Sequence, residues 1–100
     1  MNTSSNEWED KLFNDEYEKT VNEFMHKIEV DDNFTLKELQ EYLNLAYMTQ
    51  DDNWIGVGRT MEIKHDARIA GLETVKTEWT KVLEEAVKEG KLPESVLNTN

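Results

Sequence analysis

The two histidines are the first residues with chemical potential, because imidazole serves both as a metal ligand and as a general acid or base. His65 lies three residues after Glu62 and next to Asp66. Residues three apart share a helix face, so Glu62 and His65 could ligate a metal ion together. Neighbours of this kind also arise by chance on solvated helix surfaces, and we expect no metal here. His26 falls opposite the apolar stripe of its segment and is expected to be exposed.

Pairs of carboxylates one helical turn apart, such as Glu7 with Asp10 and Asp15 with Glu18, could serve general acid–base catalysis. That chemistry needs a carboxylate removed from water in a cleft, which an exposed helix face does not offer. The chain has no cysteine, no serine–histidine arrangement, no P-loop and no dinucleotide-binding glycine motif. The sequence therefore predicts a protein that is not an enzyme and that uses no cofactor.

The segment from 51 to 62 has the outline of an EF-hand calcium loop, with oxygen-bearing side chains at Asp51 and Asn53. Gly56 stands at the turn of this outline and Glu62 at its bidentate last position. Ile55, however, occupies a position that needs an oxygen ligand. An ordinary turn, in which Asp51 and Asn53 bond to nearby backbone, fits the same residues. We expect the turn, and a degenerate calcium site is the alternative.

The same segment holds the triplet Trp54-Ile55-Gly56, near the midpoint of a 100-residue chain that we expect to be helical. In these features the chain resembles the small secreted helical-hairpin substrates of the type VII secretion family, which carry a W-x-G turn. The resemblance covers three residues, the length and the helical class. It implies a secreted assembly protein that works as a dimer. The alternative, which we favour, is that Trp54 packs the loop onto the bundle.

Apolar residues recur at spacings of three and four over three segments, which predicts three amphipathic helices. They cover residues 7–30, 35–50 and 60–89. Thr35 and Glu38 form a capping box at the start of the second helix. Amphipathic helices with short connections predict an all-α fold, a small three-helix antiparallel bundle with polar tails.

Glycines punctuate the third helix. Gly71 lies inside its apolar pattern and predicts a point of close helix packing, with a kink as the alternative. Gly90 is expected to end the helix, and Pro93 prevents its resumption. The organisation that follows is a disordered tail at 1–6, a single helical domain at 7–90 and a C-terminal tail at 91–100.

Charge is the most unusual global property, since 22 acidic and 11 basic residues give a net charge of −11. The first 34 residues hold ten acids and three lysines. Such a field repels nucleic acid and anionic membranes and attracts basic surfaces. We therefore expect a basic protein as partner, with no direct binding to nucleic acid or membrane. The residues expected to bind it are Glu7, Trp8, Glu9, Asp10, Asp15, Glu16, Tyr17, Glu18 and Glu23.

Carboxylates one turn apart along a helix have a spacing broadly comparable to that of phosphates along a DNA strand. Small acidic helical proteins of phages and mobile elements mimic DNA in this way, which is an analogy of type without a sequence match. The leading hypothesis is a non-enzymatic module that inhibits or regulates a basic, nucleic-acid-binding protein. A face that only keeps the protein in solution is the alternative. With no signal-peptide pattern and no long apolar run, a cytoplasmic location is expected.

The third helix carries a longer apolar stripe than the short second helix can cover. We therefore expect a strip to remain for pairing with a second copy about a two-fold axis. The residues expected to form this homodimer contact are Leu72, Val75, Trp79, Val82 and Leu83.

Overall fold

A computed structural model of the chain describes residues 4–52 and 58–100. Three long helices, α1 (Ser4–Val30), α2 (Leu36–Asp52) and α3 (Arg59–Lys88), precede a short 3-10 helix, η1 (Glu94–Leu97). No strand occurs in these two ranges, so the predicted all-α three-helix bundle is confirmed. Because α1 begins at Ser4, residues 4–6 belong to the helix and not to the expected tail. Residues 1–3 of that tail lie outside the described residues.

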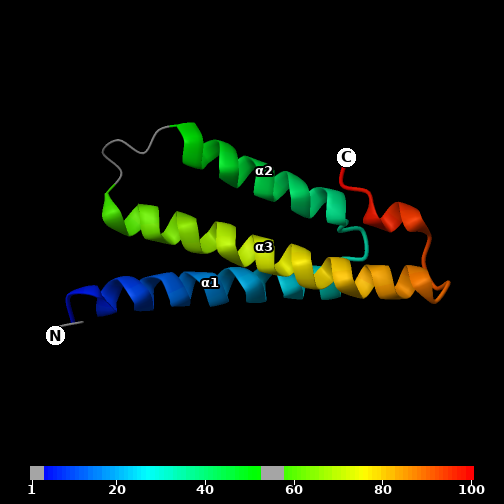
Figure 1. Cartoon of the computed structure of the whole chain (residues 1–100), viewed down its shortest axis with the longest axis horizontal. Helices are drawn as coiled ribbons and strands as arrows, with labels where there is room; N and C mark the ends of the chain where they lie inside the picture. Colours follow the sequence, from blue (N-terminus) through cyan, green and yellow to red (C-terminus); the bar gives the residue numbers. More distant parts are fainter. Residues whose placement is uncertain (1–3, 53–57) are drawn as a thin grey trace.

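The third helix is the central element of the bundle. α1 and α2 lie on opposite sides of α3, and α2 runs antiparallel to both (Figure 1). The molecule is elongated, with extents of 53, 30 and 23 Å. The η1 segment turns back beside the first turns of α2 (Figure 1). Residues of the α1–α2 connection and the C-terminal segment therefore meet at the same end of the molecule.

Side chain–backbone hydrogen bonds shape the α1–α2 connection. The Asp31 carboxylate accepts the Asn33 N–H at 3.0 Å, and the Phe34 N–H donates to the Asp31 carbonyl at 3.1 Å. The Thr35 hydroxyl accepts the Glu38 N–H at 3.2 Å, which is the N-cap bond of the predicted capping box. These hydrogen bonds fix the conformation of the turn, and Phe34 within it is buried in the core.

The end of α3 is also set by local chemistry, as predicted. Gly90 adopts a φ of 78°, a conformation that favours glycine. Its N–H donates to the Val87 carbonyl at 3.0 Å, and the Lys91 N–H donates to the Ala86 carbonyl at 2.9 Å. This pair of bonds is the Schellman motif, which satisfies helix carbonyls that would otherwise lack partners.

Gly71 lies within the continuous helix α3, at a point of close packing against α1. A Cβ placed on it would lie 2.9 Å from the Thr20 Cβ and 3.2 Å from the Tyr17 carbonyl oxygen. Thr20 is fully buried at this crossing. The glycine inside the apolar pattern therefore marks a close approach of helices, which confirms the sequence prediction.

Four aromatic side chains join the three helices and the turn. The rings of Phe34 and Trp79 are stacked with centroids 5.7 Å apart and planes 4° apart. Phe24 and Tyr42 meet edge to face at 5.1 Å, and each also lies near Phe34. The Lys27 ammonium lies 5.3 Å from the Phe34 ring centroid. A residue from the turn is therefore the hub that connects α1, α2 and α3.

The expected uncovered strip on α3 is absent from the structure. Leu72, Val75 and Leu83 are core residues, and Trp79 is half-buried against Phe34. Of the five residues predicted to form the strip, Val82 alone is largely exposed, at 64%. The strip is wrong as a surface because most of these side chains pack into the core that the three helices share with Phe34 of the turn. Pairing with a second copy stays a prediction.

The C-terminal tail, residues 91–100, folds back onto the bundle over part of its length. Residues 94–97 form η1, and Val96 and Leu97 pack against the core. They are apolar and lie four to five residues beyond Leu92, which itself stays exposed. The last ten residues are therefore partly integrated into the helical domain.

Candidate functional site

The negative charge sits on the outer elements of the bundle. α1 holds eight acidic and three basic residues, and α2 holds four acidic and one basic residue. Asp31 and Asp32 of the turn between them add two further acids. α3 holds six of each sign and is neutral. α3 is thus a neutral central helix that lies between the acidic helices α1 and α2. An acidic turn connects α1 to α2 at one end of the molecule.

Glu9, one of the residues predicted to bind a partner, makes a contact between two helices. Its carboxylate accepts hydrogen bonds from Arg59 of α3, at 3.0 Å from Nε and 3.4 Å from Nη2. Arg59 also pairs with Glu62 on its own helix. The hydrogen bond to Glu9 is the main cause that raises the pKa of Arg59, with Glu62 adding to it. Glu9 therefore joins α1 to the start of α3.

Other residues predicted to bind a partner contact side chains of the same chain. Glu23 lies 3.5 Å from Arg68 of α3, and Asp15 lies 3.1 Å from Lys11 on its own helix. The Tyr17 hydroxyl lies 2.8 Å from the Thr74 hydroxyl. Since Thr74 donates its single hydrogen to the Ala70 carbonyl, Tyr17 must donate in this pair. Tyr17 thus serves the contact between α1 and α3.

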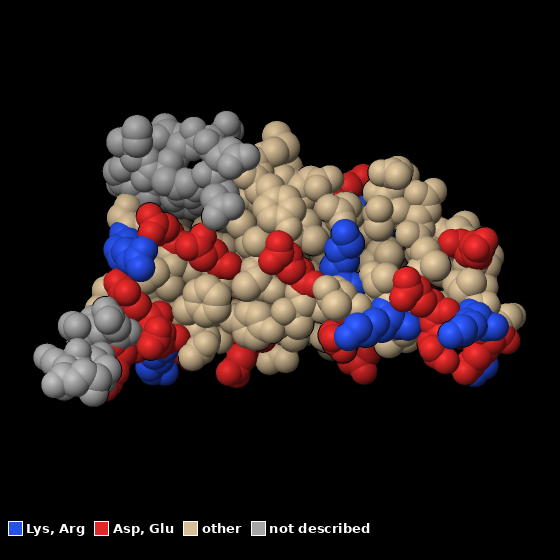
Figure 2. Space-filling model, viewed as in Figure 1, with Lys and Arg blue, Asp and Glu red and all other residues tan. Residues whose placement is uncertain are grey.

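Exposed acids remain on α1 between residues 7 and 18. Glu7, Asp10 and Glu18 are exposed and take part in no ion pair among the described residues. We call these three residues the outer acidic face. Trp8 lies beside them with 47% of its surface exposed, whereas Glu16 is half-buried. On the side seen in Figure 2, carboxylates over α1 and α3 alternate with lysine and arginine side chains.

A cavity that the sequence did not reveal lies at the end where the turn and the C-terminal segment meet. It has a volume of about 580 Å³ and is lined by both apolar and polar side chains. Phe34, Trp79 and Val96 supply apolar wall, and Asp31, Asp32 and Lys37 supply charge. The sequence signal for it is the run Asp31-Asp32-Asn33-Phe34, in which turn-forming residues precede an aromatic side chain. We call this cavity the turn pocket.

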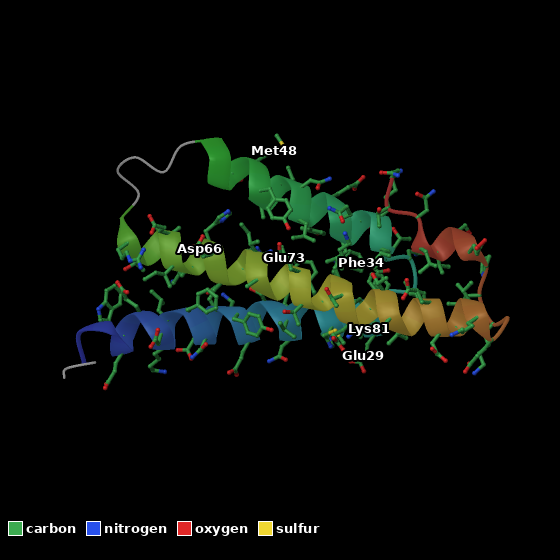
Figure 3. The ribbon with its side chains drawn as sticks, in the orientation of Figure 1. Glu29, Phe34, Met48, Asp66, Glu73 and Lys81 are labelled. Atoms are coloured by element: carbon green, nitrogen blue, oxygen red, sulfur yellow. The ribbon has the colours of Figure 1, made fainter. Side chains whose placement is uncertain are left out.

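A second hollow of about 650 Å³ lies between α2 and α3. Glu73 lies there between the two helices (Figure 3), and the Tyr47 hydroxyl donates to its carboxylate at 2.5 Å. This hydrogen bond, with a smaller contribution from burial, raises the pKa of Tyr47 to about 12. Lys76, Lys81 and Glu84 also line the hollow, so its charges largely compensate one another.

The histidine and loop hypotheses have separate outcomes. His65 Nε2 lies 2.8 Å from the Ala46 carbonyl oxygen, so the ring bridges α3 and α2. Within residues 4–52 and 58–100, no three histidine or acidic side chains are grouped to hold a metal ion. Glu62, the last acid of the calcium outline, pairs with Arg59. Trp54, Ile55, Gly56 and Asn53 lie outside the described residues.

Comparison with known proteins finds no relative: no family model, no curated protein and no solved structure matches the chain. Among the described helices, none has the length and apolar character required to cross a lipid bilayer. The charge distribution, the outer acidic face and the turn pocket are the features of the described residues that bear on function.

Proposed function

We propose that the protein is a non-enzymatic acidic binding module that inhibits or regulates a partner with a basic surface. The observation that carries the proposal is the distribution of charge over the fold. The acidic helices α1 and α2 flank a neutral α3, so the negative field is directed outward. A field of this kind accelerates encounter with a basic protein and disfavours acidic competitors.

The outer acidic face gives this field a specific place of contact. Glu7, Asp10 and Glu18 are not needed for ion pairs between helices, unlike Glu9 and Glu23. Trp8 adds an exposed aromatic surface beside them. Aromatic side chains with charged neighbours are frequent anchors in protein interfaces. Residues 7–18 of α1 therefore combine steering charge with an apolar anchor.

A nucleic-acid-binding protein is the kind of basic partner that we propose, with the protein acting as a DNA mimic of phage or mobile-element type. The support is the net charge of −11 and the helical arrangement of the carboxylates. The lysine and arginine side chains between carboxylates in Figure 2 interrupt any continuous row on that side. Mimicry would therefore depend on separate carboxylates and on the overall field.

Charge reversal on α1 tests the proposal. Partners are captured on the immobilised protein, identified by mass spectrometry, purified, and measured for affinity at two salt concentrations. The triple variant Glu7→Lys, Asp10→Lys and Glu18→Lys should weaken binding at least about tenfold and flatten its salt dependence. Circular dichroism should show an unchanged helical fold, since these side chains make no ion pair to another helix.

The matched control is the triple variant Glu84→Lys, Glu85→Lys and Glu89→Lys, which changes the net charge equally near the end of α3. These three residues are also exposed. We expect the control to weaken binding by less than about threefold. Equal losses in both variants would show that only net charge matters, and unchanged affinity in the α1 variant would refute the proposal.

A further inference from the structure

The turn pocket has a lining that suits a cation carried on an apolar stem. Phe34 and Trp79 present stacked rings, and Ile28, Leu36, Leu83 and Val96 complete an apolar wall. Phe34 lies between α3 and the beginning of α2 (Figure 3). At about 580 Å³, the cavity falls in the range of sites that hold small ligands or a short peptide segment.

Two carboxylates line the same cavity as this aromatic wall. Asp31 is half-buried, and its position is fixed because one oxygen accepts the Asn33 N–H. Asp32 follows it, is exposed, and lines the same cavity. The C-terminal end of α1 immediately precedes them, and its backbone carbonyls add further negative potential.

Two features of the lining disfavour a cation. We expect their effect to be smaller than that of the two carboxylates and the aromatic rings. Lys37 carries a positive charge, but its side chain is exposed and can extend into water. The first turn of α2 presents backbone N–H groups, one of which is already bonded to the Thr35 hydroxyl. The fold itself places a cation against one of these rings, since the Lys27 ammonium lies 5.3 Å from the Phe34 centroid.

We propose that the turn pocket binds an arginine side chain of the basic partner, an inference that builds on the proposed function. The guanidinium would pair with Asp31 and Asp32, and its methylene stem would lie on the Phe34 and Trp79 wall. A planar guanidinium suits this site better than an ammonium because it stacks on aromatic rings and pairs with carboxylates through two N–H groups. The pocket would thus supply the specific anchor for a protein that is attracted by charge.

Nuclear magnetic resonance with a defined probe tests the inference on the full chain. The probe is an acetylated, amidated peptide of alternating glycine and arginine, titrated into ¹⁵N-labelled protein at fixed ionic strength. We expect saturable shifts at the amides of 31–37 and 95–100 and at the Trp79 indole. A second peptide replaces each arginine with citrulline, which is neutral and nearly isosteric, and should bind at least about tenfold more weakly. Equal binding of the citrulline peptide would overturn the proposal.

Matched variants separate the pocket from the rest of the acidic surface. Asp31→Asn with Asp32→Asn removes two charges from the pocket and retains the oxygen that accepts the Asn33 N–H. Glu7→Gln with Glu18→Gln removes two charges from the outer acidic face. The first pair should weaken arginine-peptide binding at least about tenfold, and the second by less than about threefold.

The reverse pattern, with shifts on α1, would refute the pocket and leave the proposed function standing. Shifts that arise equally with spermidine would show a general polycation site and overturn the assignment to an arginine side chain. Absence of any saturable shift in the pocket would also refute the inference. The proposed function would then be judged by its own partner-binding variants.

Discussion

Thr20 of α1 and Gly71 of α3 approach so closely that a Cβ on residue 71 would lie 2.9 Å from the Cβ of Thr20. The contact sets the distance between the two helices that carry most of the bundle's packing. Helix backbones come this close only where one partner lacks a side chain. The pair therefore fixes the position of α1, and with it the orientation of the outer acidic face.

The first prediction concerns this contact. Gly71→Ala should lower the free energy of unfolding by about 1–3 kcal/mol through overpacking, even though alanine favours helices by about 1 kcal/mol. Urea denaturation followed by circular dichroism measures the change. Moving the glycine to the other helix, in the double variant Thr20→Gly and Gly71→Ala, should recover part of the loss. Strictly additive losses in the two single variants would show that the Cβ contact is not the cause.

The second prediction concerns two threonines in the α1–α3 interface. The Thr20 hydroxyl is buried and has no hydrogen-bond partner among the described residues. Thr20→Val should therefore be neutral or raise stability by up to about 1 kcal/mol. Thr74 is the matched control, because its hydroxyl bonds both Tyr17 and Ala70. Thr74→Val should cost about 1–2 kcal/mol in the same assay, and an equal effect at both sites would contradict this account.

The third prediction concerns the turn residue at the centre of the core. Phe34 is 5% exposed and contacts rings from all three helices. Phe34→Ala should lower the free energy of unfolding by about 3–5 kcal/mol and weaken the near-ultraviolet circular dichroism of Trp79. Val30→Ala, at a largely exposed position nearby in the chain, should change stability by less than about 0.5 kcal/mol. A small effect at Phe34 would mean that the turn does not hold the helices together.

The fourth prediction is a pH dependence. The hydrogen bond to Glu73 raises the pKa of Tyr47 from 10.0 to about 12. Its stabilising contribution should be complete below pH 10 and should be lost as the pH rises from 10 to about 12. Absorbance of the tyrosinate form measures the titration, and Tyr47→Phe identifies its share. Glu73→Gln should return the pKa of Tyr47 toward its ordinary value; an unchanged titration would exclude Glu73 as the cause.

The sequence determined the features that depend on neighbours within one or two helical turns. Periodic apolar residues located the three helices, Thr35 marked the cap of α2, and Gly90 marked the end of α3. These outcomes follow from local hydrogen bonds and from backbone conformations that particular residues favour. A glycine inside an apolar helix pattern also predicts close helix packing, and Gly71 lies at such a contact with Thr20.

Only the tertiary structure decided which side chains remain available at the surface. Glu9 meets Arg59 across fifty positions of sequence, and Leu72 and Val75 are buried in the core that the helices share. Pairings of this range depend on how each helix is rotated about its axis and on what the turns carry inward. The turn pocket arises in the same way, since Asp31, Trp79 and Val96 come from three distant segments. Net charge is a property of composition, but the site where it can act is a property of packing.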